Sequence, residues 1–161
     1  MCKTPNKSDG FSLVELIVVV GIIGILAAIA VPKLQMFTAK AKRAEAVNTL
    51  RQVHALQSTL FAEKSTYTQL WSELGVSQAS LDGKYYGAPS LLSFVSEYLA
   101  VINLKTGVSL CPGVSQDIWF VGNCLNPTFE NCSEYAGTTG KTQEQLFSGK
   151  PVPARDTLRC R

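Results

Sequence analysis

The stretch that decides the fold is FSLVELIVVVGIIGILAAIAV, residues 11–31. As an α-helix it would span roughly 31 Å, about the thickness of a bilayer core. Glu15 is its single charged residue. A core helix of a small soluble protein needs only an apolar stripe, whereas this segment is apolar on every side. The sequence therefore predicts a membrane-spanning helix here.

The length and flanks of the segment distinguish it from an ordinary secretory signal. The apolar part of such a signal is usually ~7–15 residues long and ends at a cleavage site between small residues. Here the run is longer, contains a carboxylate, and continues into a helical pattern interrupted by Pro32. A lipoprotein signal also fits poorly, because Cys2 precedes the apolar run instead of following it.

Glu15 needs an explanation. A carboxylate within a bilayer costs ~2.5–3.5 kcal/mol on insertion scales, and such residues usually have both a partner and a function. Residues 11–31 contain no Lys or Arg that could pair with it. An α-amino group created by cutting the chain just before the apolar run would supply a suitable cation.

The motif GFSLVE, residues 10–15, follows a short basic leader and precedes the apolar helix. In this arrangement it resembles the class III signal of type IV pilins and pseudopilins, and the resemblance covers residues 1 to about 75. It implies that a prepilin peptidase cuts after Gly10 on the cytoplasmic side and N-methylates Phe11. It also implies that Glu15 neutralises the N-terminal amine of a neighbouring subunit. A generic membrane anchor with an incidental glutamate is the alternative.

The positive charges disagree with this orientation. Four cations follow the apolar run (Lys33, Lys40, Lys42 and Arg43), against Lys3 and Lys7 before it. Counting by the positive-inside rule would place the C-terminal side in the cytoplasm. We follow the leader motif, because processing requires a cytoplasmic leader and because the cysteines discussed below suit an oxidising compartment.

Glycine and proline interrupt the apolar helix at Gly21, Gly24 and Pro32. Proline removes one backbone hydrogen bond and clashes with the preceding turn, so we expect a kink or local loosening near residues 28–32. The resemblance implies that the stretch between Gly24 and Pro32 unwinds in assembled filaments. A passive kink, which membrane helices tolerate well, is the alternative.

Residues 32–65 predict an amphipathic continuation of the helix at ~100° per residue. The apolar side carries Met36, Ala39, Ala46, Val47, Leu50, Val53, Leu60 and Phe61, and the opposite side carries Lys40, Glu45, Asn48, Arg51, Gln52, Thr59 and Glu63. A helix over residues 11–65 would be roughly 80 Å long, too long to be buried in a domain of this size. His54, the single histidine, lies at the edge of the apolar side, and we expect it to pack against the head rather than act as a base.

The remaining sequence predicts a small head. KYYG (residues 84–87) and DIWFVGN (residues 117–123) are typical of strands. The apolar spacing in residues 90–102 predicts a helix, with Pro89 near its first position and a buried strand as the alternative. An antiparallel sheet packed on the second half of the long helix is the expected architecture. We expect the aromatic side chains in core or subunit contacts; they are Tyr67, Trp71, Tyr85, Tyr86 and Trp119.

Four cysteines remain once Cys2 leaves with the leader: Cys111, Cys124, Cys132 and Cys160. An even number in an exported domain suggests two disulfides, for which three pairings exist. We favour Cys111–Cys124, which brackets the strand at 117–123, and Cys132–Cys160, which pins the tail. A zinc site is the alternative, although no C-x-x-C pair is present.

The whole pattern predicts an α+β protein in four parts. These are a cleaved leader at 1–10, a transmembrane and assembly helix at 11–31, its amphipathic continuation at 32–65, and a globular head at 66–161 with a disulfide-stapled C-terminal loop. The expected function is a structural subunit of a type IV pilus-like filament, with no catalytic residues, metal or cofactor. A type II secretion pseudopilin or minor pilin is the first alternative, and a membrane-anchored periplasmic enzyme or binding module is the second.

The resemblance also implies partners and a location. The partners are other copies of the chain, a prepilin peptidase, the inner-membrane assembly machinery, and membrane lipid before assembly. The subunit would cross the inner membrane once with a periplasmic head, and then enter an extracellular pilus or periplasmic filament. The net charge of +3, from 15 basic and 12 acidic residues, is too mild to indicate nucleic acid.

Overall fold

The computed structural model describes residues 10–93, 95, 97–111, 114, 116–123 and 149–153. Within this part of the chain, a long helix is followed by a short 3-10 helix (η1, Gln78–Leu81) and four strands. The chain divides into two compact units, Met1–Gln35 and Met36–Arg161.

Helix α1 spans Leu13–Lys64, 52 residues that belong partly to each unit. Pro32 lies inside the helix and does not end it. The helix stops where the sequence predicts, because Ser65 adopts a left-handed conformation with a φ of 55° while its N–H still donates to the carbonyl of Phe61 at 2.8 Å. This left-handed residue closes the last turn in the manner usually supplied by glycine.

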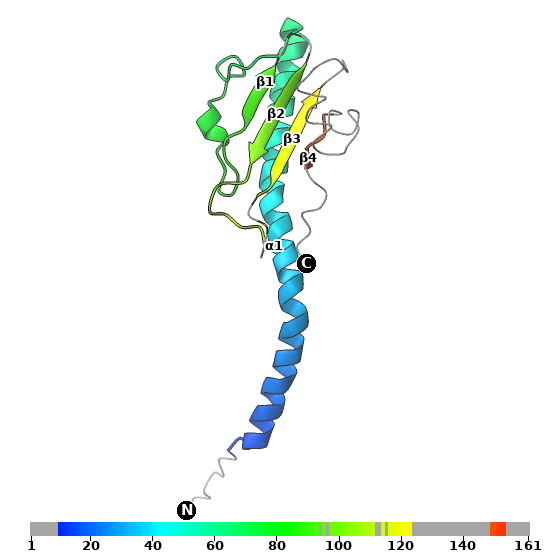
Figure 1. The fold of residues 1–161 in the computed structure, drawn as a ribbon, viewed down its shortest axis with the longest axis vertical. Helices are drawn as coiled ribbons and strands as arrows, with labels where there is room; N and C mark the ends of the chain where they lie inside the picture. Colours follow the sequence, from blue (N-terminus) through cyan, green and yellow to red (C-terminus); the bar gives the residue numbers. More distant parts are fainter. Residues whose placement is uncertain are drawn as a thin grey trace, which may run out of the picture. The chain divides into compact units, whose positions relative to one another are not determined.

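The sheet belongs to the second unit and contains β1 (Ser90–Ser93), β2 (Tyr98–Asn103), β3 (Ile118–Asn123) and β4 (Val152–Pro153). The strands are antiparallel and lie in the order β1-β2-β3-β4. The β2–β3 ladder is the longest and runs from the pair Tyr98↔Asn123 to the pair Asn103↔Ile118. Figure 1 shows the sheet beside the part of α1 that belongs to the same unit. The expected α+β arrangement is confirmed.

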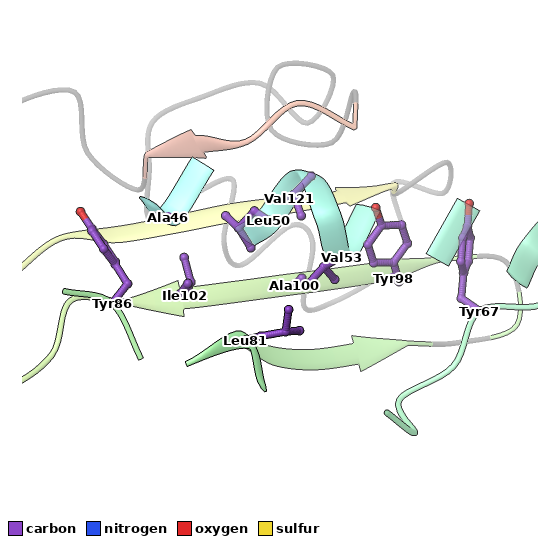
Figure 2. Packing of buried hydrophobic residues seen from close by; sticks show 10 residues of the cluster. All are labelled: Ala46, Leu50, Val53, Tyr67, Leu81, Tyr86, Tyr98, Ala100, Ile102 and Val121. Carbon is purple, nitrogen blue, oxygen red and sulfur yellow. The ribbon is translucent and has the colours of Figure 1, made fainter. Parts of the chain in front are cut away.

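The hydrophobic core lies between α1 and the sheet (Figure 2). Its members come from α1 (Ala46, Leu50 and Val53), from β2 and β3 (Tyr98, Ala100, Ile102 and Val121) and from the connecting loops (Tyr67, Leu81 and Tyr86). The three β2 residues alternate along the strand, so their side chains share the face that packs on the helix. A smaller cluster joins Ala39 of α1 to Leu110, Cys111 and Val114.

The amphipathic prediction for α1 is largely confirmed. The predicted apolar residues that are buried are Ala39, Ala46, Leu50, Val53 and Leu60. Met36, placed on the same side, is 44% exposed. The core interpretation of the five loop and strand aromatics is also confirmed: Tyr67 and Tyr86 are buried, and Trp71, Tyr85 and Trp119 pack against the core.

The helix predicted at residues 90–102 is wrong. The chain there forms β1 and most of β2, paired from Ser90↔Val101 to Ser93↔Tyr98. Leu99 and Ala100 are both buried, so β2 is covered on both faces and does not show the alternation that marks a half-exposed strand. In such a run, the apolar spacing alone does not separate helix from strand. The strand predicted at 117–123 is confirmed as β3.

The strand predicted at residues 84–87 is also wrong, apart from an isolated bridge between Tyr86 and Leu104. The backbone N–H groups of Tyr85 and Tyr86 both donate to Oε1 of Glu45, each at 2.8 Å. The segment keeps two backbone hydrogen bonds beside this bridge, from the N–H of Gly87 to the carbonyl of Asn103 and from the N–H of Lys105 to the carbonyl of Tyr85, each at 2.9 Å. The N–H groups of Tyr85 and Tyr86 are bound by α1, and the pairing does not extend beyond the single bridge.

Candidate assembly site

The predicted processing residues stand at the start of α1. Gly10, Phe11 and Ser12 precede the helix, and the N–H of Leu16 donates to the carbonyl of Ser12 at 3.2 Å. Phe11 is 82% exposed, and Glu15 is exposed in the first helical turn. The partial positive charge at a helix N-terminus favours a carboxylate in this turn. The structure thus places Gly10 and Phe11, the predicted cleavage residues, and Glu15 within one accessible stretch.

The first part of α1 has an unburied apolar surface. α1 is the helix in the described chain that is long and apolar enough to cross a membrane, and none of its most apolar 18-residue window is buried within the chain. The exposed side chains include Leu16, Ile17, Val20, Ile23, Leu26, Ile29 and Leu34. A contiguous apolar surface of this kind marks a site of association with protein or membrane.

Gly21 and Gly24 make no close contact within the single chain. A Cβ added at either position meets no atom within 4 Å. The described chain therefore gives no internal packing reason for a small residue at these two positions.

Asp117 is the centre of a buried polar network in the second unit. Its Oδ2 accepts from Nε of Arg43 at 3.2 Å, from Nε1 of Trp119 at 2.9 Å, and from the hydroxyl of Tyr86. Asp117 is 3% exposed. Burial raises the pKa of Tyr86, and the hydrogen bond and charge of Asp117 raise it further, so this hydroxyl remains a donor. The network fastens α1 to the segment that leads into β3.

Glu45 provides a second anchor. Its carboxylate receives the two backbone N–H groups of Tyr85 and Tyr86, and a Cβ added at Gly83 would overlap Oε1 of that carboxylate. Glycine at position 83 therefore lets the turn close over the carboxylate. The amphipathic pattern assigned Glu45 to the polar side, and nothing in the sequence indicated that this side also receives a loop.

Two further side chains attach the C-terminal part of α1 to the head. Gln57 is fully buried; its Nε2 donates to the carbonyl of Thr68 at 2.6 Å, and the N–H of Thr68 donates to its Oε1 at 3.2 Å. Nδ1 of His54 hydrogen-bonds the hydroxyl of Tyr98, whose ring stacks on the imidazole. Burial lowers the pKa of His54. The packing role predicted for His54 is confirmed, whereas the role of Gln57 was missed.

The cysteine predictions fall mostly outside the described residues. Cys111 is 6% exposed in the smaller cluster with Ala39, while Cys124, Cys132 and Cys160 are not among the described residues, nor is the leader at 1–9. Among the described residues, no group of three or more His, Cys, Asp or Glu side chains is placed to hold a metal ion. The polar contacts described above join α1 to the loops at residues 68, 85–86 and 117 and, through Tyr98, to β2.

Comparison with known proteins first defines a class. The family model for the prokaryotic N-terminal methylation motif matches residues 5–31. The chain is 42% identical over 81 residues to the type IV major pilin protein PilA of Myxococcus xanthus, a match that covers 50% of this chain and 36% of that protein. It is 34% identical over 101 residues to the type IV major pilin protein PilE of Neisseria gonorrhoeae, covering 62% of this chain and 52% of that protein.

A longer match extends the likeness into the head. The chain is 31% identical over 153 residues to a fimbrial protein of Neisseria meningitidis serogroup A, covering 92% of this chain and 76% of that protein. The chain belongs to the type IV pilin family, and the resemblance inferred from GFSLVE is confirmed. It spans only about a third to a half of the length of the two major pilins.

Proposed function

We propose that the protein is a structural subunit of a type IV pilus-like filament, without catalytic activity. Its working parts are a leader at residues 1–10, an assembly helix at 11–31, an amphipathic continuation at 32–65 and a head at 66–161. The observation that carries the proposal is the unburied apolar surface of α1, which directly follows the GFSLVE motif. The match to two major pilins adds support.

The proposed processing step is cleavage after Gly10 by a prepilin peptidase, followed by N-methylation of Phe11. The methylation-motif match over residues 5–31 contains both positions. An added Cβ at Gly10 meets no atom within 4 Å, and Phe11 is exposed. An enzyme can therefore reach this peptide bond without opening the fold.

The proposed assembly step transfers α1 from lipid to a bundle of identical helices. The apolar surface of residues 13–34 exchanges lipid for neighbouring helices, and Glu15 pairs with the methylated amine of Phe11 on another copy. Within a low-dielectric bundle an unpaired carboxylate is costly, so this pairing selects the axial position of the incoming subunit. The open surface at Gly24 leaves room for a close neighbour, and the missing N–H of Pro32 supplies a point where the helix can loosen.

The proposed location is the inner membrane, with the head in the periplasm, and afterwards the filament. The positive-inside disagreement weakens once the contacts of the cations are considered. Arg43 is paired with Asp117, and the Lys42 ammonium donates to the carbonyl of Ser109 at 2.6 Å. Because these two cations have specific partners in the head, the count of four cations after the apolar run is weaker evidence for a cytoplasmic C-terminal side.

The proposed cysteine pairing is Cys111–Cys124 and Cys132–Cys160. It is supported by the burial of Cys111 and by its being a disulfide cysteine, which suits an oxidising compartment. Two disulfides would hold the long C-terminal region against the sheet; a loop closure of this size typically stabilises by ~2–4 kcal/mol.

The experiment that tests the function replaces Glu15 by alanine in living cells. We expect the Glu15→Ala protein to be processed and membrane-bound but missing from sheared surface filaments. Glu63→Ala, an exposed carboxylate at the other end of the same helix, is the matched control and should assemble normally. Normal filaments from the Glu15→Ala strain would refute the pairing. Periplasmic assembly without surface filaments, seen by electron microscopy, would favour a type II secretion pseudopilin.

A further inference from the structure

One end of the second unit carries a cluster of lysines that the assembly proposal does not use. We call Lys40, Lys42, Lys84, Lys105 and Tyr85 the basic rim. The ammonium groups of Lys42 and Lys84 lie 5.4 Å and 5.3 Å from the centroid of the Tyr85 ring. Lys105 is held in place by Oδ2 of Asp82 and the carbonyl of Gly83, each at 2.7 Å.

The nearby carboxylates do not neutralise the rim. Asp117 is buried in its network with Arg43, and Glu45 is bound to two backbone N–H groups. Asp82 pairs with Lys105. Within the described part of the chain, no ion pair with a carboxylate involves Lys40, Lys42 or Lys84. The positive charges of Lys42 and Lys84 therefore flank the Tyr85 ring without a carboxylate partner, although the Lys42 ammonium also donates to the carbonyl of Ser109. The Lys40 ammonium lies instead 6.0 Å from the centroid of the Phe37 ring.

The position of the rim within its unit is defined by contacts. Residues 42–45 of α1 contact the loops at 83–86, 109 and 117, whereas residues 54–57 contact Thr68 and Tyr98 at the other end. The rim thus lies at the end of the head from which α1 leads back toward the apolar run. In the sequence, Lys40 follows Val31 by nine residues and Lys42 follows it by eleven.

We propose that the basic rim binds the headgroups of anionic phospholipids while the subunit is still in the membrane. The proposal rests on the proposed function, which makes residues 11–31 a membrane span. Lys and Arg clusters next to a span attract anionic lipid, and lysine can extend its ammonium along an apolar stem to reach the headgroups. A half-buried tyrosine between ammonium groups also suits the headgroup region, where aromatic rings with one polar end are enriched.

The test uses the full-length chain in phosphatidylcholine nanodiscs with and without phosphatidylglycerol. A water-soluble amine reagent labels the lysines, and peptide mass spectrometry gives the rate at each position. The reagent attacks the neutral amine, and an anionic surface raises the local proton concentration about threefold, so rim lysines should react about threefold more slowly over phosphatidylglycerol. High salt should abolish the difference. Lys64, at the other end of α1 in the same unit, is the internal control and should be unaffected.

Paired variants sharpen the result. In Lys40→Gln/Lys84→Gln the slowing of Lys42 labelling over phosphatidylglycerol should become smaller, because two of the charges that attract anionic lipid to this end of the head are gone. In Lys64→Gln the slowing at Lys42 should be unchanged. Equal labelling of rim lysines in both lipids would overturn the inference, as would protection that appears only after polymerisation, which would assign the rim to a second copy. A chain that fails to insert into either nanodisc would instead contradict the proposed function.

Discussion

The two parts of α1 differ in where their apolar side chains lie. Residues 13–34 expose large apolar side chains on all sides, while residues 39–60 bury one stripe against the sheet and bind loops through Arg43 and Glu45. The first part therefore depends on its surroundings for burial, and the second finds burial within its own chain. Substitutions should separate them, since changes in the first part alter association and changes in the second alter the stability of the head.

The head can be followed selectively because both tryptophans, Trp71 and Trp119, pack against its core. Denaturant unfolding of the full-length protein in detergent, monitored by tryptophan fluorescence, therefore reports on the second unit. The next four predictions use this measurement.

The largest expected effect is at Asp117. Asp117→Ala removes the acceptor shared by Arg43, Tyr86 and Trp119, and breaking a buried charge pair costs about 3–5 kcal/mol of unfolding free energy. The matched control is Asp82→Ala, which removes an exposed ion pair with Lys105 and should cost less than about 1 kcal/mol. Equal losses in the two variants would show that the Asp117 network is not a main anchor.

The prediction with the next largest effect compares one leucine from each part of α1. Leu50 is fully buried and Leu26 is 61% exposed. Leu50→Ala should lower the unfolding free energy of the head by about 2–5 kcal/mol, because it leaves a cavity between α1 and the sheet. Leu26→Ala should change it by less than about 0.5 kcal/mol. A destabilising Leu26→Ala would mean that the first part of α1 is not independent of the head.

Gly83 tests the Glu45 anchor. Gly83→Ala places a Cβ against the carboxylate of Glu45 and should cost about 2 kcal/mol, through strain or loss of the two backbone hydrogen bonds. Gly87→Ala is the control, because its added Cβ meets no atom closer than 3.9 Å. If Gly83→Ala unfolds like Gly87→Ala, the turn does not depend on Glu45.

The smallest effect is a pH dependence from His54. Burial lowers the pKa of His54 below its ordinary value of 6.5, so the unfolded chain binds a proton more readily than the folded one. The stabilisation is complete above pH 6.5 and is lost as the pH falls below it. His54→Gln should flatten the decrease in unfolding free energy between about pH 7.5 and about pH 5.5. An unchanged slope would assign the decrease to other groups.

The sequence predicted features set by local chemistry. The GFSLVE motif, the apolar run and the end of α1 near Ser65 each depend on a short stretch, and so does the aromatic strand at β3. Pairings between distant segments were missed. Residues 90–102 form strands because β2 packs against a helix and two neighbouring strands. Residues 84–87 form one isolated bridge, and Glu45, about forty residues earlier, accepts the N–H groups of Tyr85 and Tyr86.

The apolar helix of the candidate assembly site was predicted from the sequence. The polar side chains that attach α1 to the head were not. Arg43 was counted as one of several cations after the span, and Gln57 was not singled out. Both are polar residues whose partners are fixed by tertiary structure, and helical periodicity carries no information on such partners. The same limit applied to Glu45 and to the basic rim.

The most direct test of the central claim is mass spectrometry of the N-terminal peptide of the protein sheared from the surface of living cells. We expect this peptide to begin at Phe11 and to carry one N-methyl group. Surface material that still begins at Met1 would contradict the account, because Glu15 would then have no neighbouring amine with which to pair.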